Sequence, residues 1–206
     1  MSAQLGRPRE FDEEEVLSDI MSAFWKNGYE GTGLAQIIDA TGLKKGSLYK
    51  AFENKHDMYL KALSHYEKTA VDPTVKFLTS DSAAPFERVK SYLSAPINAV
   101  WDKNDSRGCF LCNASADYAA HDDNTRALVA RGYGKMERAL MVPIKQLNPK
   151  WSQPKLESAA QHCLSVYAGL RIMSRAAVDR KRLEGARDAC LGTLTYLKIS
   201  DLRRQN

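Results

Sequence analysis

The sequence predicts an all-α protein of about nine helices, in which a three-helix helix-turn-helix domain precedes a larger helical domain. Apolar residues recur at helical spacing along most of the 206 residues, and no run alternates with the two-residue period of a strand. Residues 34–60 contain two short apolar patterns that are out of phase and are separated by Gly42. A hydrophobic content of 44% suffices for one sizeable core, or for a small domain joined to a larger one.

Composition excludes several classes of protein. The longest apolar runs are far shorter than the roughly 20 residues that cross a bilayer, and the acidic segment after Arg9 does not resemble a signal peptide. We therefore expect a cytoplasmic protein with no membrane contact. Four cysteines in a chain of this length do not make a disulfide framework, and a cytosolic setting keeps them reduced.

The charge distribution is more informative than the net charge of +5. Residues 1–60 contain 7 Lys and Arg against 10 Asp and Glu, a balance of −3, so bulk charge does not attract this end to nucleic acid. Four lysines nevertheless lie within twelve residues, at positions 44, 45, 50 and 55. Their local placement, rather than the total charge, predicts a surface that binds an anionic partner.

The first helix is expected to follow Asp12, whose side chain can cap its free N–H groups, and to stop at Asn27 and Gly28. Glu15, three residues after Asp12, completes a capping-box pattern. Asn54 is placed to cap a fourth helix in the same way.

Residues 34–52 read as two helices joined by a tight turn. Leu48 and Phe52 are expected to anchor the second of them, which leaves its basic and hydroxyl side chains to face outward. Those side chains can donate hydrogen bonds to phosphates or to base edges.

The rest of the chain is also helical in period. Pro73 and the polar residues 79–85 are expected to mark a loose boundary, and Pro143 should kink or shorten a later helix. The helices expected after this boundary cover residues 86–101, 109–120, 124–147, 152–178 and 182–198.

The segment FWKNGYEGTGLAQIIDATGLKKGSLYKAFENK, residues 24–55, resembles the amino-terminal domain of TetR-type (TetR/AcrR) transcriptional regulators. The ordered set of elements carries the likeness: the PheTrp-x-x-GlyTyr entry, the Gly-Leu turn, the Lys-Gly-Ser-Leu-Tyr helix ending in Phe52, and the Asn-Lys start of the next helix. The resemblance implies a DNA-binding domain at residues 1–70, with the helix-turn-helix at about 33–52, and a regulatory and dimerisation domain at 71–206. It also implies a homodimeric repressor that a small-molecule effector releases from a palindromic DNA operator.

Ten residues are expected to contact DNA, from the entry of the second helix, from the third helix, and from the start of the fourth. By the family resemblance, Tyr49 and Lys55 hold phosphates. The full set is Thr32, Gly33, Gln36, Lys44, Lys45, Gly46, Ser47, Tyr49, Lys50 and Lys55. A solvated lysine face is the alternative for the basic cluster alone.

The last helix carries a stripe of small residues at Gly185, Ala189 and Gly192, beside which another helix can pack closely. We expect a four-helix interface made by two subunits. An internal seam within one subunit is the alternative.

The larger domain is rich in aromatic residues and methionine, which predicts an apolar cavity with a few polar points for an effector. Ordinary core packing is the alternative for each of them. The residues expected to bind the effector are Trp101, Phe110, Asn113, His121, Tyr133 and Tyr167.

Cys109 and Cys112 lie near a helix start, where a thiol becomes more acidic and more reactive. The alternatives to a small-molecule-released repressor are therefore control by a protein partner, or by thiol oxidation or electrophiles at these cysteines. No cofactor is expected, and no metal site is expected because His121, His162 and Cys163 do not complete a four-ligand spacing. Without a phosphate-binding loop or a nucleophile elbow, we expect no enzyme activity.

Overall fold

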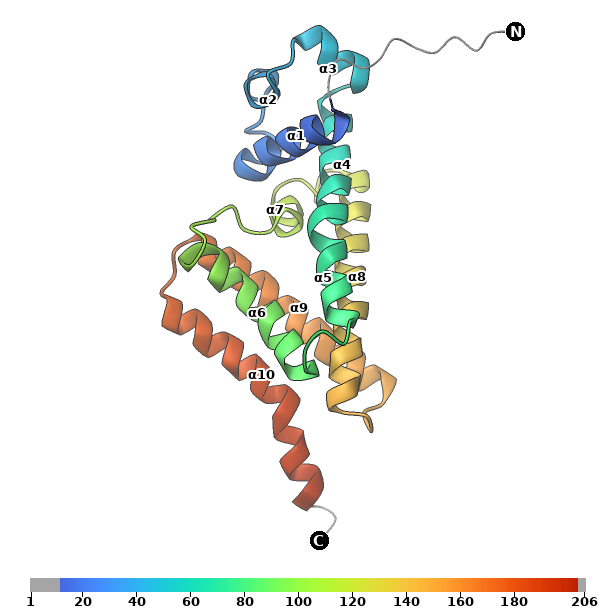
Figure 1. Ribbon diagram of the computed structural model, residues 1–206, viewed down its shortest axis with the longest axis vertical. Helices are drawn as coiled ribbons and strands as arrows, with labels where there is room; N and C mark the ends of the chain where they lie inside the picture. The colour runs from blue at the N-terminus through green and yellow to red at the C-terminus, as the bar shows by residue number, and fades with distance from the viewer. Residues whose placement is uncertain (1–11, 204–206) are drawn as a thin grey trace, which may run out of the picture. The chain divides into compact units, whose positions relative to one another are not determined.

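The computed structural model describes residues 12–203, and the side chains of residues 12–195. All regular structure in this part of the chain is helical (Figure 1). The chain forms two compact units, which divide between His65 and Tyr66, whereas the sequence placed the domain boundary after residue 70. No helix of the described residues is both long and apolar enough to cross a membrane.

Helices α1 to α4 belong to the amino-terminal unit, apart from the last residue of α4. Their bounds are α1 Glu13–Asn27, α2 Leu34–Thr41, α3 Lys45–Ala51 and α4 Lys55–Tyr66. The Asp12 carboxylate accepts a hydrogen bond from the Glu14 N–H at 2.9 Å, and Asn54 Oδ1 accepts one from the Asp57 N–H at 2.9 Å. These local bonds explain why α1 and α4 begin where the sequence predicts.

Two glycines end helices of this unit in a conformation that suits glycine. Gly28 follows α1 with φ of +75°, and Gly42 follows α2 with φ of +65°. The short turn after Gly42 leads directly into α3. The core beneath these helices contains Ile20, Phe24, Ile37, Leu48, Phe52, Met58 and Tyr59, all buried.

Helix α4 does not end at the unit boundary but continues through a π-helical turn, η1 (Glu67–Val71), into α5 (Asp72–Thr79). The N–H of Asp72 donates to the carbonyl of Glu67, five residues back. Pro73 has no N–H to donate and lies within the first turn of α5, a position that a helix tolerates. The expectation that Pro73 marks a loose boundary was therefore wrong, because the proline changes the helical register without breaking the helix.

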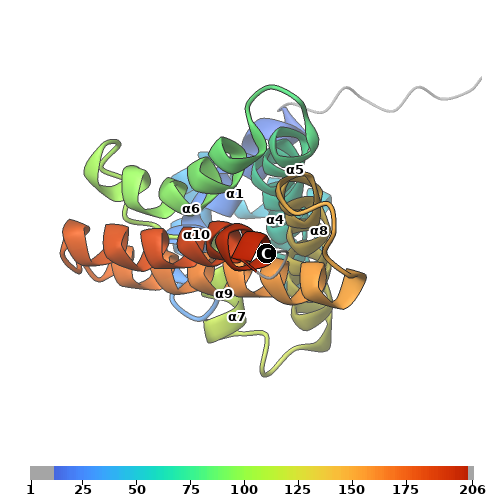
Figure 2. The same cartoon turned by 90° about the horizontal axis from the view of Figure 1, so that it is seen from below.

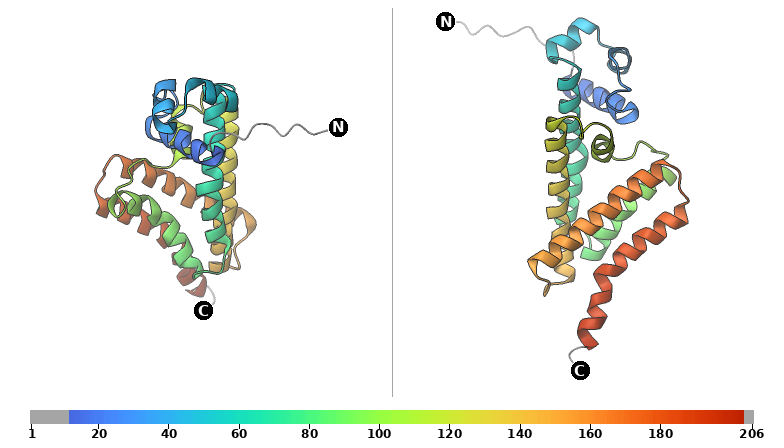
Figure 3. Two further views of the ribbon diagram at one scale, coloured as in Figure 1. Left: turned by 45° about the horizontal axis from the view of Figure 1, so that its top comes forward. Right: turned by 180° about the vertical axis from the view of Figure 1, so that it is seen from behind.

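The second unit is completed by five further helices, so that nine separate helical rods make up the described residues. They are α6 Pro85–Trp101, α7 Phe110–Asp117, α8 Asp123–Leu147, α9 Gln153–Arg175 and α10 Arg180–Arg203. Helix α8 packs against both α5 and α9. Both views in Figure 3 show α5 and α8 running side by side. Figure 2 shows α6, α9 and α10 side by side. Ile97, Leu170 and Leu183, one from each of these helices, form a buried cluster.

Candidate DNA-binding helix and buried cavity

Helix α3 has one buried face and one exposed face. Leu48 is fully buried and Phe52, which follows the helix, is 2% exposed, whereas Tyr49 is 44% exposed. The apolar anchors fix the rotation of α3, so the side chains between them point to solvent. The exposed face of α3 thus presents a large tyrosine beside lysines, which suits contact with an anionic partner.

The sequence-predicted DNA-binding residues of α3 share this exposed face. Lys44, Lys45 and Lys50 are exposed and Ser47 is half-buried. The ammonium group of Lys45 lies 5.9 Å from the centre of the Tyr49 ring. A Cβ atom added to Gly46 would meet nothing within 4 Å, so the packing of this unit does not require glycine there.

Lys55, at the start of α4, is held by an aromatic ring. Its ammonium group lies 4.3 Å from the centre of the Tyr29 ring, and Tyr29 in turn packs against Tyr59 at 5.0 Å between ring centres. The contact fixes the position of a cation whose side chain is half-buried.

The entry of α2 is more enclosed than the sequence suggested. Thr32 is fully buried, and its hydroxyl donates to the carbonyls of Gly28 at 2.7 Å and Ala23 at 3.3 Å. The N–H of Gly33 donates to Gln36 Oε1 at 2.9 Å. Thr32 therefore has a role inside the unit, while Gly33 and Gln36 remain at the surface.

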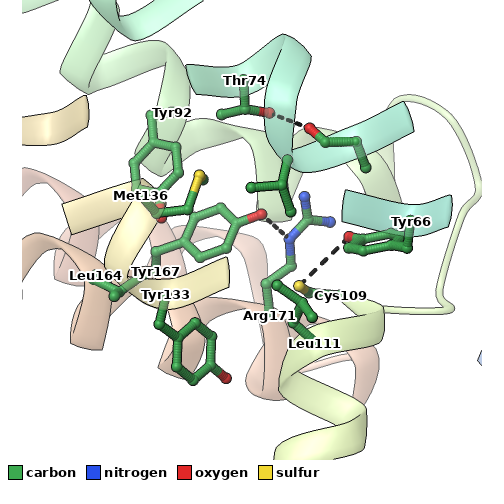
Figure 4. A pocket seen from close by; sticks show the side chains of 12 residues that line it. Tyr66, Thr74, Tyr92, Cys109, Leu111, Tyr133, Met136, Leu164, Tyr167 and Arg171 are labelled. Carbon is green, nitrogen blue, oxygen red and sulfur yellow. Dashed lines mark hydrogen bonds between the residues drawn. The ribbon is translucent and has the colours of Figure 1, made fainter. Parts of the chain in front are cut away.

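A partly enclosed cavity of about 70 Å³ lies within the second unit (Figure 4). Space of this size holds on the order of five or six non-hydrogen atoms. None of the twelve lining residues is acidic, and they come from α4, η1, α5, α6, α7, α8 and α9 and the residue before α7. They are Tyr66, Ala70, Val71, Thr74, Tyr92, Cys109, Leu111, Tyr133, Met136, Leu164, Tyr167 and Arg171.

The guanidinium of Arg171 lines this cavity and has few hydrogen-bond partners. Its Nε donates to the Tyr167 hydroxyl at 2.9 Å, which is its only hydrogen bond to the described residues. It forms no salt bridge among them: its charge helps to lower the pKa of Asp105, but that carboxylate pairs with Arg107 at 2.9 Å. The Tyr92 ring stacks on Tyr167 at 4.3 Å, yet the buried Tyr92 hydroxyl has no hydrogen-bond partner. The cavity therefore offers hydrogen-bond donors that the protein itself does not use.

Cys109, the residue before α7, lines the same cavity as this guanidinium. Figure 4 shows Arg171 between the Tyr167 hydroxyl and the pair formed by Tyr66 and Cys109, whose Oη and Sγ atoms are 3.5 Å apart. The hydrogen bond from the Cys112 side chain, the charge of Arg171 and the Tyr66 hydroxyl outweigh burial and lower the pKa of Cys109 to about 6. The same interaction with Cys109 and burial raise the pKa of Cys112, so the two thiols are chemically distinct.

The cavity includes some of the residues that the sequence suggested for effector binding. Tyr133 and Tyr167 line it. Of the others, Trp101 packs against the core of Ile97, Leu170 and Leu183, and Phe110 packs edge-on against Tyr66 with ring centres 5.8 Å apart.

The two polar residues suggested for the effector also lie elsewhere. The amide of Asn113 donates to the Arg107 carbonyl at 2.8 Å, and His121 is exposed. Sequence reasoning missed Arg171, although its spacing of four residues from Tyr167 on one helix was visible.

The residues expected at a dimer interface lie on a surface of α10. Gly185 and Ala189 are exposed and Gly192 is partly exposed. Added Cβ atoms at Gly185 and Gly192, and at Gly169 on α9, would meet nothing within 4 Å. These glycines therefore do not serve packing within one subunit.

All four cysteines are free and buried. Cys163 on α9 and Cys190 on α10 have sulfur atoms 3.8 Å apart within the packed interior. Among the described residues no group of three or more His, Cys, Asp or Glu is arranged to hold a metal ion.

Comparisons with known proteins agree with the helix-turn-helix segment and extend beyond it. The family described as bacterial regulatory proteins, tetR family, matches residues 16–62. The HTH-type transcriptional repressor ComR of Escherichia coli K12 is 25% identical over 182 residues, covering 86% of this chain and 86% of ComR. The HTH-type transcriptional regulator YezE of Bacillus subtilis is 23% identical and covers 92% of this chain and all of YezE.

Solved structures show the same fold. The TetR family regulator CifR, a cysteine mutant complexed with 26-bp double-strand operator DNA, is 26% identical with a TM-score of 0.76, covering 90% of this chain and 98% of CifR. The reduced form of NemR from E. coli is 18% identical with a TM-score of 0.74, covering 86% of this chain and 94% of NemR. Sequence motif, relatives and fold agree: residues 16–62 form a DNA-binding domain of the TetR family, and the chain has the fold of TetR-family transcriptional regulators.

Proposed function

We propose that the protein is a homodimeric repressor that binds a palindromic operator through α3 and is released when a small molecule occupies the cavity of the second unit. The exposed row of lysines and Tyr49 on α3, anchored from behind by Leu48 and Phe52, is the observation that carries this proposal. A helix of this length and amphipathic character fits a major groove about 12 Å wide.

The proposed DNA contacts divide into two groups. Lys44, Lys45 and Lys50 neutralise phosphates or reach base edges, and the Tyr49 hydroxyl donates to a phosphate. Gly46 allows the backbone to approach the duplex. The contacts at the edges of this surface come from Gly33, Gln36, Ser47 and Lys55.

The operator complex of CifR supports this assignment, since that relative shares a quarter of its residues and nearly its whole length with this chain. The amino-terminal 60 residues have a balance of −3. Affinity for the operator must therefore arise from a few well-placed contacts. Two copies of α3, one from each subunit and at a fixed spacing, increase this affinity by binding together.

The proposed dimer interface is the exposed small-residue surface of α9 and α10. An added Cβ atom at Gly169, Gly185 or Gly192 would meet nothing within 4 Å in the same subunit, so these positions leave room for the backbone of a second helix. The apolar side chains of Ile172 and Met173, 58% and 40% exposed, extend this surface toward the end of α9.

A small-molecule effector accounts for the cavity better than a protein partner does. The cavity contains an unpaired buried hydroxyl and an arginine without a carboxylate, whereas a fully packed core would leave neither. Apart from Tyr49, the large apolar side chains exposed in the described part of the chain are Ile172 and Met173, which the dimer interface uses.

The decisive experiment selects bound sequences from random duplex DNA and then screens small molecules for release of the selected site. We expect a site with two-fold symmetry, bound by two chains, and an affinity that falls steeply with salt. A selected site without two-fold symmetry, or no selected site, would contradict the proposal.

A further inference from the structure

The cavity of the second unit contains the cationic side chain of Arg171, which has no close anionic partner. The Arg171 side chain is half-buried and forms no salt bridge with a carboxylate among the described residues, since the nearby Asp105 pairs with Arg107 at 2.9 Å. A half-buried guanidinium without a close counter-charge is costly, so we look for the anion among the other lining groups.

Cys109 is the group that can supply this charge. It is 6% exposed, it lines the same cavity, and the Tyr66 hydroxyl donates to its sulfur. The tyrosines that line the cavity cannot take its place, because burial raises the pKa of Tyr66, Tyr92, Tyr133 and Tyr167. At neutral pH the thiolate of Cys109 is thus the available anion.

Tyr92 adds an independent indication of a ligand. Its side chain is 3% exposed and lines the cavity, but its hydroxyl donates to no protein atom. This hydroxyl and, separately, the terminal nitrogens of Arg171 are donors that an oxygen-containing ligand of the cavity can satisfy.

We propose that Cys109 and Arg171 are counter-ions within the cavity, and that the effector is a small, neutral α,β-unsaturated carbonyl compound which abolishes this ion pair by alkylating Cys109. This inference rests on the proposed function and names its effector class. A ligand of about five or six non-hydrogen atoms matches the space available.

The chemical step balances without an oxidant. The sulfur lone pair of the thiolate forms a bond to the β-carbon, and the C=C π electrons move to give an enolate, whose oxygen the terminal nitrogens of Arg171 stabilise. Water then protonates the α-carbon. The product is a neutral thioether, so the cavity loses one negative charge and keeps the guanidinium.

Loss of that charge explains how a small adduct could change the protein. Arg171 is left without its anion in a cavity whose wall includes Tyr66, Ala70 and Val71, at the end of α4 and in the π turn. Rearrangement to solvate the guanidinium must move this wall. Helix α4 begins in the amino-terminal unit, so the wall is continuous in the chain with the DNA-binding unit.

The test uses the purified full-length protein, methyl vinyl ketone as the probe, and butanone as the saturated control. We expect one adduct per chain, mapped to Cys109 by peptide mass, together with release of the selected operator. Butanone should give neither result. Cys109→Ser should gain no adduct in the cavity and stay on the operator at every probe concentration.

The pH dependence of alkylation tests the role of Arg171 as the counter-ion. The groups that face Cys109 are Cys112, Tyr66, Tyr92, Tyr133, Tyr167 and Arg171. In the wild type the rate should have its midpoint near pH 6, because the pKa of Cys109 is about 6. Arg171→Met should move the midpoint upward by about one to two pH units, whereas Arg171→Lys should largely restore it.

Arg175→Met is the matched control, since Arg175 is exposed one turn further along α9. Its pH midpoint should equal that of the wild type. An unchanged pH midpoint of alkylation in Arg171→Met, or an adduct at another cysteine, would overturn the proposal that Cys109 and Arg171 form an ion pair.

A wild-type protein that is alkylated at Cys109 and remains on the operator would overturn the inference while the repressor function stood. Failure to select any operator would instead contradict the proposed function, and the pH profile would still decide the ion pair.

Discussion

The carboxylate of Glu67 accepts two hydrogen bonds from the guanidinium of Arg131, at 2.9 Å from Nε and 2.7 Å from Nη2. Glu67 lies in the π turn and Arg131 on α8. Lys135, one turn further on α8, bridges Glu67 at 2.5 Å and Asp72 at 2.7 Å. A single buried carboxylate thus attaches the irregular turn to the longest neighbouring helix.

Glu67→Gln should lower the stability of the second unit at neutral pH. Burial opposes ionisation of Glu67, but hydrogen bonds from Arg131 and Lys135 outweigh it and hold its pKa below the usual value. A lowered pKa means that this stabilisation is present above the pKa of the unfolded chain and is lost as pH falls through the folded value. We expect a loss of about 1–2 kcal/mol at pH 7, measured by urea denaturation, that shrinks below about pH 4.

Glu137→Gln, also on α8, is the control and should change stability little at either pH. If the loss of stability in Glu67→Gln were the same at acidic and neutral pH, packing and not the charge of Glu67 would explain that loss.

Gly46 should separate stability from DNA binding. Its Cβ position is open and its φ is not positive, so Gly46→Ala should stabilise the protein by about 0.4–1 kcal/mol through the unfolded state. Gly46→Leu should also fold, because nothing lies near the new side chain, but it should weaken operator binding at least about tenfold by holding the backbone away from DNA. Thermal unfolding and fluorescence anisotropy measure the two effects, and tight binding by Gly46→Leu would exclude close approach at this position.

Lys45→Ala should reduce the salt dependence of operator binding. Loss of one phosphate contact lowers the slope of log affinity against log salt by about 0.9 per subunit. Combination with Tyr49→Phe should weaken binding further. Lys26→Ala, an exposed lysine on α1, is the control; wild-type affinity in the double variant would refute the roles given to both residues.

Ala189→Glu should convert the protein to a monomer without unfolding it. The residue is exposed in one subunit, so the carboxylate is solvated there but buried without a partner in the proposed interface. Light scattering at micromolar concentration should give the mass of one chain, and circular dichroism should be unchanged. Ala127→Glu makes the same change at an exposed alanine of α8 and should leave the mass at its wild-type value.

Much of the fold could be predicted because its signals are local. Asp12 and Asn54 cap helices through bonds to N–H groups two or three residues away, and Gly28 and Gly42 adopt the positive φ that ends a helix. The exposed face of α3 followed from the spacing of Leu48 and Phe52. These relationships span only a few residues, so the sequence displays them directly.

The cavity could not be predicted in the same way. Its lining residues come from seven helical segments and one connecting residue, and whether an aromatic side chain faces this space or the neighbouring core depends on helix rotation. Trp101 and Tyr167 both belong to apolar stripes, yet only Tyr167 lines the cavity. The π turn was missed for a different reason: a proline is a helix breaker in most contexts, and only its place in the first turn of α5 makes it compatible with a continuous helix.

The small volume of the cavity also acts as a size filter for thiol chemistry. Cys109 is 6% exposed in a space for about five or six atoms, so glutathione, a tripeptide, is too large to react with its sulfur. The thioether formed at Cys109 contains no disulfide bond for a cellular thiol to reduce, so the adduct would persist in a reducing environment. Recovery of repression would then depend on synthesis of new protein. Derepression would therefore continue after the α,β-unsaturated carbonyl compound has disappeared and would not follow its concentration reversibly.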